Sequence, residues 1–132
     1  MKSLWYSAQI AIVAIGSSVS WFLGGMDMYL YALMFFIIAD YITGVMKSIV
    51  KRSLSSQIGT KGIFKKTTIF ILIGLTNLID EYLLMGNGIF KNAVILFYIS
   101  NEGISILENA YAIGLPIPEK LKNFLKQLKS EK

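Results

Sequence analysis

The chain has 132 residues, of which 55% are apolar and 16% are charged, and its formal net charge is +5 at pH 7. Soluble domains carry about 25% charged residues, so this composition favours a membrane protein with room for one small domain. The absence of Cys and His excludes disulfides, a thiol nucleophile, a histidine base and the usual zinc sites. No motif pairs the remaining side chains as nucleophile and base, so we expect no enzymatic activity and no cofactor.

Four apolar segments are each long enough to cross a hydrocarbon core of about 30 Å. They predict transmembrane helices at about residues 4–24, 28–46, 67–85 and 89–114. Gly24 and Gly25 separate the first two segments, and residues 86–88 (Gly-Asn-Gly) separate the last two, which is typical of tight turns. The predicted fold is therefore all-α: an integral membrane protein with four transmembrane helices in two hairpins, within a domain of residues 1–115.

Small residues follow two faces of the first predicted span. Such faces allow helices to approach closely in lipid, within one subunit or between subunits, and the sequence leaves both possibilities open. The residues concerned are Ser7, Ala11, Ala14, Gly16, Ser18, Ser20 and Gly24.

Two segments outside the spans are basic: the loop at residues 47–66 and the tail at residues 116–132. The positive-inside rule places both, and the two termini, in the cytoplasm. Leu121, Phe124, Leu125 and Leu128 have helical spacing, so the tail is expected to lie as an amphipathic helix on an anionic inner leaflet. A merely solvated tail is the alternative. This topology accounts for the charge without a nucleic-acid partner. The predicted membrane-surface contacts are Lys47, Lys51, Arg52, Lys61, Lys65, Lys66, Lys120, Lys122, Lys126 and Lys129.

Polar residues also occur inside the spans. An acid at the bilayer centre costs about 2.5–3.5 kcal/mol on insertion scales, so we expect these side chains to face the bundle interior or a pore. The fourth span carries five of them on one helical face, and the second and third spans repeat the pattern more weakly. The predicted lining residues are Asp40, Thr43, Asn77, Asp80, Asn101, Glu102, Ser105, Glu108 and Asn109.

Lys91 is the one basic residue clearly inside a predicted span. A hairpin that turns at residues 86–87 places it beside Glu81, which predicts a Glu81–Lys91 ion pair near the outer surface. The remaining span acids then have no cation at their own depth, so we expect them to be protonated, hydrogen-bonded to amides or hydrated. Three interpretations of the polar face stay open: hydrogen bonding between helices, a lining that becomes wet on assembly, and an ion or proton pathway.

Four short stretches occur in a fixed order along the chain: Asp40–Gly44, Ser55–Lys66, Phe97–Asn109 and Gly114–Pro118. Together they resemble the toxin-secretion and phage-lysis holin family, which includes clostridial toxin-release holins. The resemblance implies a protein of the bacterial cytoplasmic membrane that associates with copies of itself and permeabilises the membrane, releasing an endolysin or a toxin. A small ion or proton channel, a transporter subunit and an antiholin that regulates a holin are the alternatives.

Overall fold

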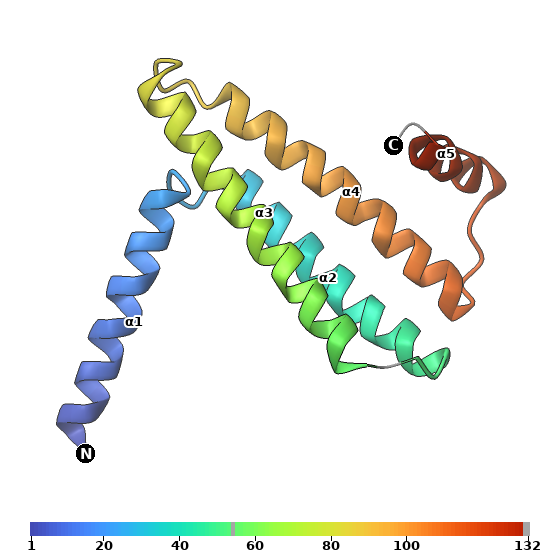
Figure 1. The fold of residues 1–132 in the computed structure, drawn as a ribbon, viewed down its shortest axis with the longest axis horizontal. Coiled ribbons are helices and arrows are strands. Elements are labelled where there is room, and N and C mark those ends of the chain that lie inside the picture. The colour runs from blue at the N-terminus through green and yellow to red at the C-terminus, as the bar shows by residue number, and fades with distance from the viewer. Residues whose placement is uncertain (54, 131–132) are drawn as a thin grey trace.

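The structure is a computed structural model, which describes residues 1–53 and 55–130. The described residues form five α-helices and confirm the all-α prediction (Figure 1). They are α1 (Lys2–Phe22), α2 (Met28–Val50), α3 (Ser56–Tyr82), α4 (Ile89–Ile113) and α5 (Glu119–Ser130).

Two helices of the described residues are long and apolar enough to cross a membrane, namely α2 and the part of α3 from Gly59 to Tyr82. Both α1 and α4 have sufficient length, with 21 and 25 residues, but are less apolar. The predicted four spans are therefore supported in part. The spans assigned to α1 and α4 stay predictions.

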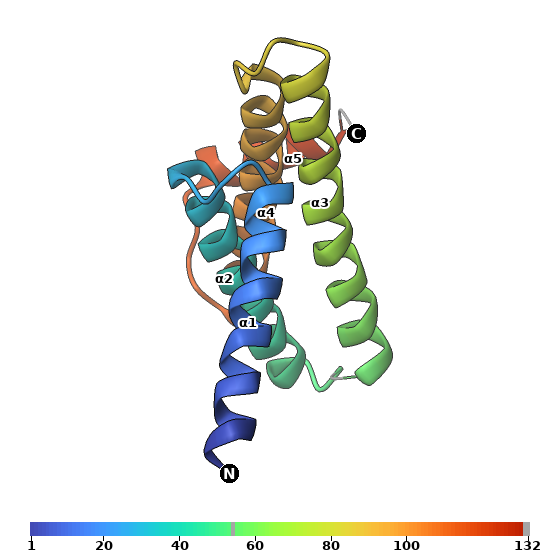
Figure 2. The ribbon, with the colours of Figure 1, turned by 90° about the vertical axis from the view of Figure 1, so that its left-hand side faces the viewer.

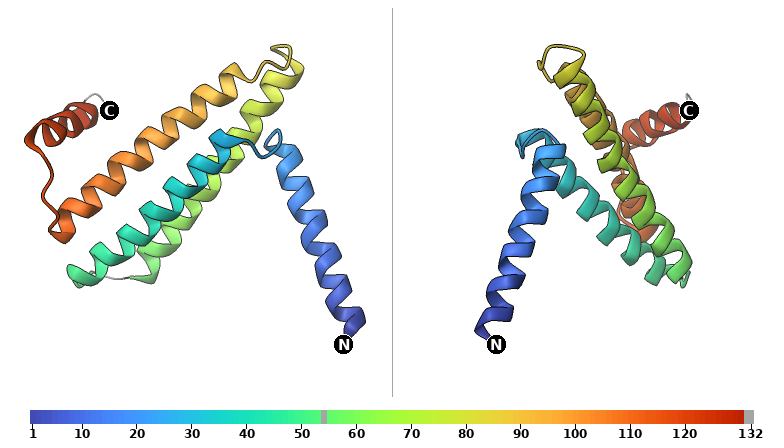
Figure 3. Two further views of the ribbon diagram at one scale, coloured as in Figure 1. Left: turned by 180° about the vertical axis from the view of Figure 1, so that it is seen from behind. Right: turned by 60° about the vertical axis from the view of Figure 1, so that its left-hand side comes forward.

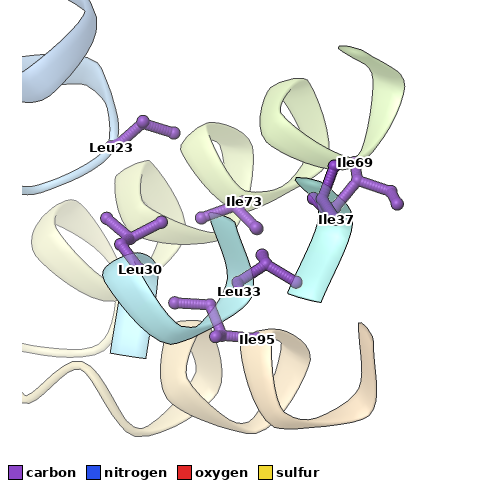
Figure 4. Close-up of a cluster of buried hydrophobic side chains, with 7 residues drawn as sticks. All are labelled: Leu23, Leu30, Leu33, Ile37, Ile69, Ile73 and Ile95. Carbon is purple, nitrogen blue, oxygen red and sulfur yellow. The ribbon is translucent and has the colours of Figure 1, made fainter. Parts of the chain in front are cut away.

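Helices α2, α3 and α4 run side by side as a bundle, and α4 packs against both of the others (Figures 1 and 2). We name the end with the turns at residues 23–27 and 83–88 the outer end, and the end with the connection at residues 51–55 the inner end. Buried aliphatic side chains fill the outer half of the bundle (Figure 4). These are Leu23, Leu30, Leu33, Ile37, Ile69, Ile73 and Ile95.

The loop predicted at residues 47–66 is largely helical. Helix α2 continues to Val50, and α3 begins at Ser56 after the extended residue Ser55, so only a short connection joins them. Lys66 therefore lies about three turns inside α3 rather than in a surface loop. Because α3 begins this early, the bundle includes the Lys66 side chain, which the sequence placed outside the spans.

Helix α1 diverges from the bundle (Figures 1 and 3). It is held at its C-terminal end, where Asn77 Nδ2 of α3 donates to the Phe22 carbonyl at 3.3 Å. No residue of α1, which is described in full, is buried. The structure therefore does not place its small-residue faces against another helix of the same subunit, and contact between subunits stays a prediction. The exposed or partly exposed small residues are Ser7, Ala11, Ala14, Gly16, Ser18 and Ser20.

Gly74 on α3 is the point where the Phe22 ring fits against that helix. A Cβ atom at this position would overlap the ring, whereas a Cβ at Gly16 would meet open space. Overpacking costs about 1–3 kcal/mol, and Ala gains up to about 1 kcal/mol over Gly in any helix. Gly74→Ala should therefore be about 1–3 kcal/mol less stable than the matched control Gly16→Ala, measured by unfolding in detergent. Equal stabilities would contradict the packing of Phe22 on α3.

Candidate functional site

Three charged side chains from three helices meet in the inner half of the bundle, and we name them the inner ion cluster. The Lys66 ammonium of α3 lies 2.6 Å from Asp40 Oδ2 of α2. The same Nζ atom lies 2.7 Å and 2.6 Å from Oε1 and Oε2 of Glu102 on α4. One cation therefore contacts two carboxylates on different helices and joins all three helices of the bundle.

Helical spacing explains why these groups meet. Asp40 follows Ile37 by one turn on α2, and Lys66 precedes Ile69 by one turn on α3, so each continues a face that carries the aliphatic core. Glu102 is 2% exposed and Asp40 9% exposed, while the Lys66 side chain keeps 22% of its surface accessible. The inner ion cluster therefore borders the aliphatic core on its inner side, and its cation is the most exposed of the three groups.

Asn109 extends the cluster toward the inner end, since it lies about two turns beyond Glu102 on α4. Its Nδ2 donates to Asp40 Oδ1 at 3.0 Å, to the Asp40 carbonyl at 3.3 Å and to Thr43 Oγ1 at 2.9 Å. The Thr43 hydroxyl in turn donates to the Ala39 carbonyl at 2.8 Å. Among the described residues, every buried side-chain nitrogen and oxygen has a hydrogen-bond partner. In this part of the chain, other protein atoms therefore satisfy the buried polar side chains.

Two sequence-based expectations about charge are wrong here. Lys66 is not a membrane-surface residue of a loop, and Asp40 and Glu102 do have a cation at their own depth. The reason is the early start of α3, which carries Lys66 into the bundle. Its position could have been recognised from periodicity, because Lys66 shares its spacing with the buried face of α3. That face continues through Ile69, Ile73, Thr76 and Asp80.

A second polar group lies at the outer end of the bundle. Asp80 is 1% exposed and accepts the backbone N–H groups of Phe90 at 3.3 Å and Lys91 at 2.7 Å. These N–H groups belong to the first turn of α4, where no intrahelical acceptor exists. Asp80 therefore caps α4 and is separated from the inner ion cluster by the aliphatic core.

The predicted Glu81–Lys91 ion pair is wrong. In the described part of the chain the Lys91 ammonium pairs with Asp27 Oδ2 at 3.7 Å, and Glu81 is exposed. Because Asp80 holds the start of α4, its neighbour Glu81 is rotated about 100° around the helix, away from Lys91. The hairpin register correctly predicts that Lys91 and Glu81 lie near the outer end, but it does not predict that they point in different directions around their helices.

Asp27 also caps α2, since its Oδ1 accepts the Leu30 N–H at 3.0 Å. Asp27→Asn removes the long ion pair, in which the Asp27 side chain is half exposed and the Lys91 side chain is buried, but keeps a good capping group. Stability should therefore fall by about 1–2 kcal/mol. Asp27→Ala removes both interactions and should cost about 1 kcal/mol more. Thermal unfolding in detergent compares the two. An equal loss in both variants would show that charge, rather than capping, is the important property of Asp27.

Two recesses lie on either side of Lys66. An inner cavity of about 660 Å³ is formed by the inner ends of α2, α3 and α4. Its lining combines glycine, serine and threonine residues with apolar side chains such as Val45 and Ile63 and with the polar Asp40, Glu108 and Asn109. A groove of about 550 Å³ between α3 and α4 is lined by Asn101 and Glu102. Lys66 and Ser105 line both recesses.

The predicted lining residues thus divide into two groups. Most of them lie in the inner half of the bundle, around the cluster and the two recesses. By contrast, Asn77 and Asp80 lie at the outer end and do not join them. The inner group comprises Asp40, Thr43, Asn101, Glu102, Ser105, Glu108 and Asn109.

Most predicted membrane-surface lysines are exposed. They are Lys47, Lys51, Lys61, Lys65 and Lys120, together with Arg52. Lys122 instead lies 4.3 Å from the centre of the Tyr111 ring and 3.9 Å from Glu119 Oε1. The side chains of Lys126 and Lys129 lie outside the described part of the structure.

Known proteins resemble this chain over most of its length. Residues 17–130 match the model of the bacteriophage holin family. A Clostridium perfringens protein, described as an uncharacterized 14.9 kDa protein in the nagH 3′ region, is 46% identical over 121 residues, which cover 92% of each chain. The probable holin of Bacillus phage phi105 is 36% identical over 110 residues, which cover 83% of this chain and 81% of that protein. No solved structure matches.

Proposed function

The chain belongs to the bacteriophage holin family, whose members are non-enzymatic proteins of the cytoplasmic membrane, and we propose that it permeabilises the bacterial cytoplasmic membrane by self-association. The lesion would let an endolysin or a toxin leave the cytoplasm. The observation that carries this proposal is the inner ion cluster with its polar surroundings, in a helical protein that exposes apolar side chains.

The cluster suits a protein that first accumulates without damage. Charged and polar groups inside a membrane must be satisfied within the protein, and here Lys66, Asp40, Glu102 and Asn109 satisfy one another. A single subunit can therefore stay in lipid as a closed bundle. The same groups would become a hydrophilic wall once the helices separate and associate with those of other subunits.

The aliphatic core argues for several subunits in the lesion. Leu30, Leu33, Ile73 and Ile95 are 0% exposed and fill the outer half of the bundle. The two recesses that contact Lys66 lie toward the inner end, so a polar route through one subunit would have to cross this core. A folded protein also needs an opening much wider than the space between the helices of one subunit. We therefore place the lumen between subunits.

The topology that goes with this proposal has four spans and cytoplasmic termini. Large apolar side chains such as Ile10 on α1, Phe35 on α2 and Phe97 on α4 are more than half exposed, which suits contact with lipid. The exposed lysines of the inner end would contact anionic headgroups, and Lys61 and Lys65 are among them. Each such contact would contribute about 1 kcal/mol to the binding of the membrane surface. Helix α5, which lies outside the bundle in Figure 1, would rest on the same leaflet.

Induced expression in a bacterial host tests the proposal. Membrane potential and leakage of a cytoplasmic reporter enzyme are followed together, with and without a co-expressed endolysin. Abrupt depolarisation with enzyme release is the expected result. Depolarisation without release of the enzyme would favour an ion channel. No leak from cells that contain the protein in their membrane would favour an antiholin or an inert scaffold.

A further inference from the structure

The inner ion cluster contains two carboxylates and one ammonium. Lys66 is the cation that the structure brings into contact with Asp40 and Glu102, and it makes all three of its short contacts to oxygen atoms of those two residues. Without Lys66, α2 and α4 would present two acids to each other in a largely buried setting. The charge balance in the inner half of the bundle therefore depends on one side chain.

Lys66 also borders two spaces. It lines both the inner cavity and the groove between α3 and α4. Of the two buried core residues one helical turn further out, Ile69 also lines the groove, whereas Ile37 lines neither space. Its side chain is partly exposed, and its neighbours Lys61 and Lys65 on α3 are exposed. A lysine at such a boundary can extend its flexible stem toward water. Departure of the ammonium would connect the two spaces and bring water to the aliphatic core.

We propose that Lys66 is an internal latch: its contacts with Asp40 and Glu102 hold α2 and α4 of one subunit together, and their release exposes the polar face to water. This inference rests on the proposed function and specifies the step that precedes a lesion. The latch sets the free-energy gap between a closed and an opened subunit. Contacts between subunits shift the population toward the open form only by binding that form more strongly.

A cysteine reporter measures this opening independently of any lesion. The chain has no cysteine, so Ile37→Cys places a single thiol in the core, where the native side chain is 9% exposed. Membranes permeabilised to a charged maleimide are then labelled over time. Lys66→Met should accelerate labelling about tenfold or more. Lys65→Met, which removes the adjacent exposed lysine, is the matched control and should leave the rate unchanged.

Glu102→Gln provides a second variant if Lys66→Met does not accumulate. It keeps the Lys66–Asp40 ion pair while removing the charge on α4, so it should fold and label at an intermediate rate. Equal labelling rates in Lys66→Met and Lys65→Met, or an unchanged rate in Glu102→Gln, would overturn the latch. Accelerated labelling in cells that never release the reporter enzyme would keep the latch and overturn the proposed function instead.

Discussion

Lys66→Met is expected to lower the stability of the bundle by about 3–5 kcal/mol, because it leaves Asp40 and Glu102 facing each other without a cation. Removing one partner of a buried ion pair forces the remaining charge to be neutralised or hydrated at the expense of folding. The partial exposure of Lys66 favours the lower end of this range. Helicity followed through a denaturant titration in detergent measures the change.

A triple variant separates the effect of charge from that of packing. Adding Asp40→Asn and Glu102→Gln to Lys66→Met removes both uncompensated charges and should restore most of the lost stability. An amide at position 40 still offers an acceptor to Asn109, whose Nδ2 lies 3.0 Å from the present carboxylate oxygen. The prediction would be contradicted if the triple variant were as unstable as Lys66→Met, or if Lys65→Met alone produced the same loss.

Asp80→Ala should destabilise the bundle by about 2–3 kcal/mol. The substitution leaves the N–H groups of Phe90 and Lys91 without their acceptor, one of them in a buried hydrogen bond, and an unsatisfied buried donor costs about 1–3 kcal/mol. Asp80→Asn keeps one acceptor oxygen, which can serve the shorter bond from the Lys91 N–H, but places its Nδ2 donor against the Phe90 N–H. It should therefore lose about 1–2 kcal/mol, less than Asp80→Ala. The same denaturant titration compares the three proteins.

Glu81→Ala is the control for Asp80→Ala, because it changes the next residue of α3, whose side chain is exposed. Its stability should stay within about 0.5 kcal/mol of the parent protein. A loss as large as that of Asp80→Ala would show that general acidity at the outer end, rather than capping of α4, stabilises the hairpin.

Much of the fold could be predicted from the sequence because it depends on local chemistry. The glycine turns lie where they were expected, and Gly24, Gly86 and Gly88 all have positive φ values that other residues rarely adopt. The polar face of α4 also follows from helical spacing, which puts Glu102 and Asn109 on the same side of that helix. These features need no knowledge of how distant helices pack.

The remaining features depend on tertiary contacts. The basic neighbours Lys61 and Lys65 favour a loop at Lys66, although α3 continues through all three residues. Hairpin register pairs Glu81 with Lys91, because register specifies depth along a helix but not direction around it. The divergence of α1 depends on where Phe22 packs against Gly74, which hydrophobicity alone does not indicate.

Purified protein in sealed liposomes tests the central claim most directly. The vesicles contain a small dye and a folded protein of endolysin size, and release of both is measured as the protein-to-lipid ratio rises. The account predicts a threshold ratio above which dye and protein leave together, because the lumen lies between associated subunits. Release of dye alone at every ratio, increasing linearly with protein, would contradict it.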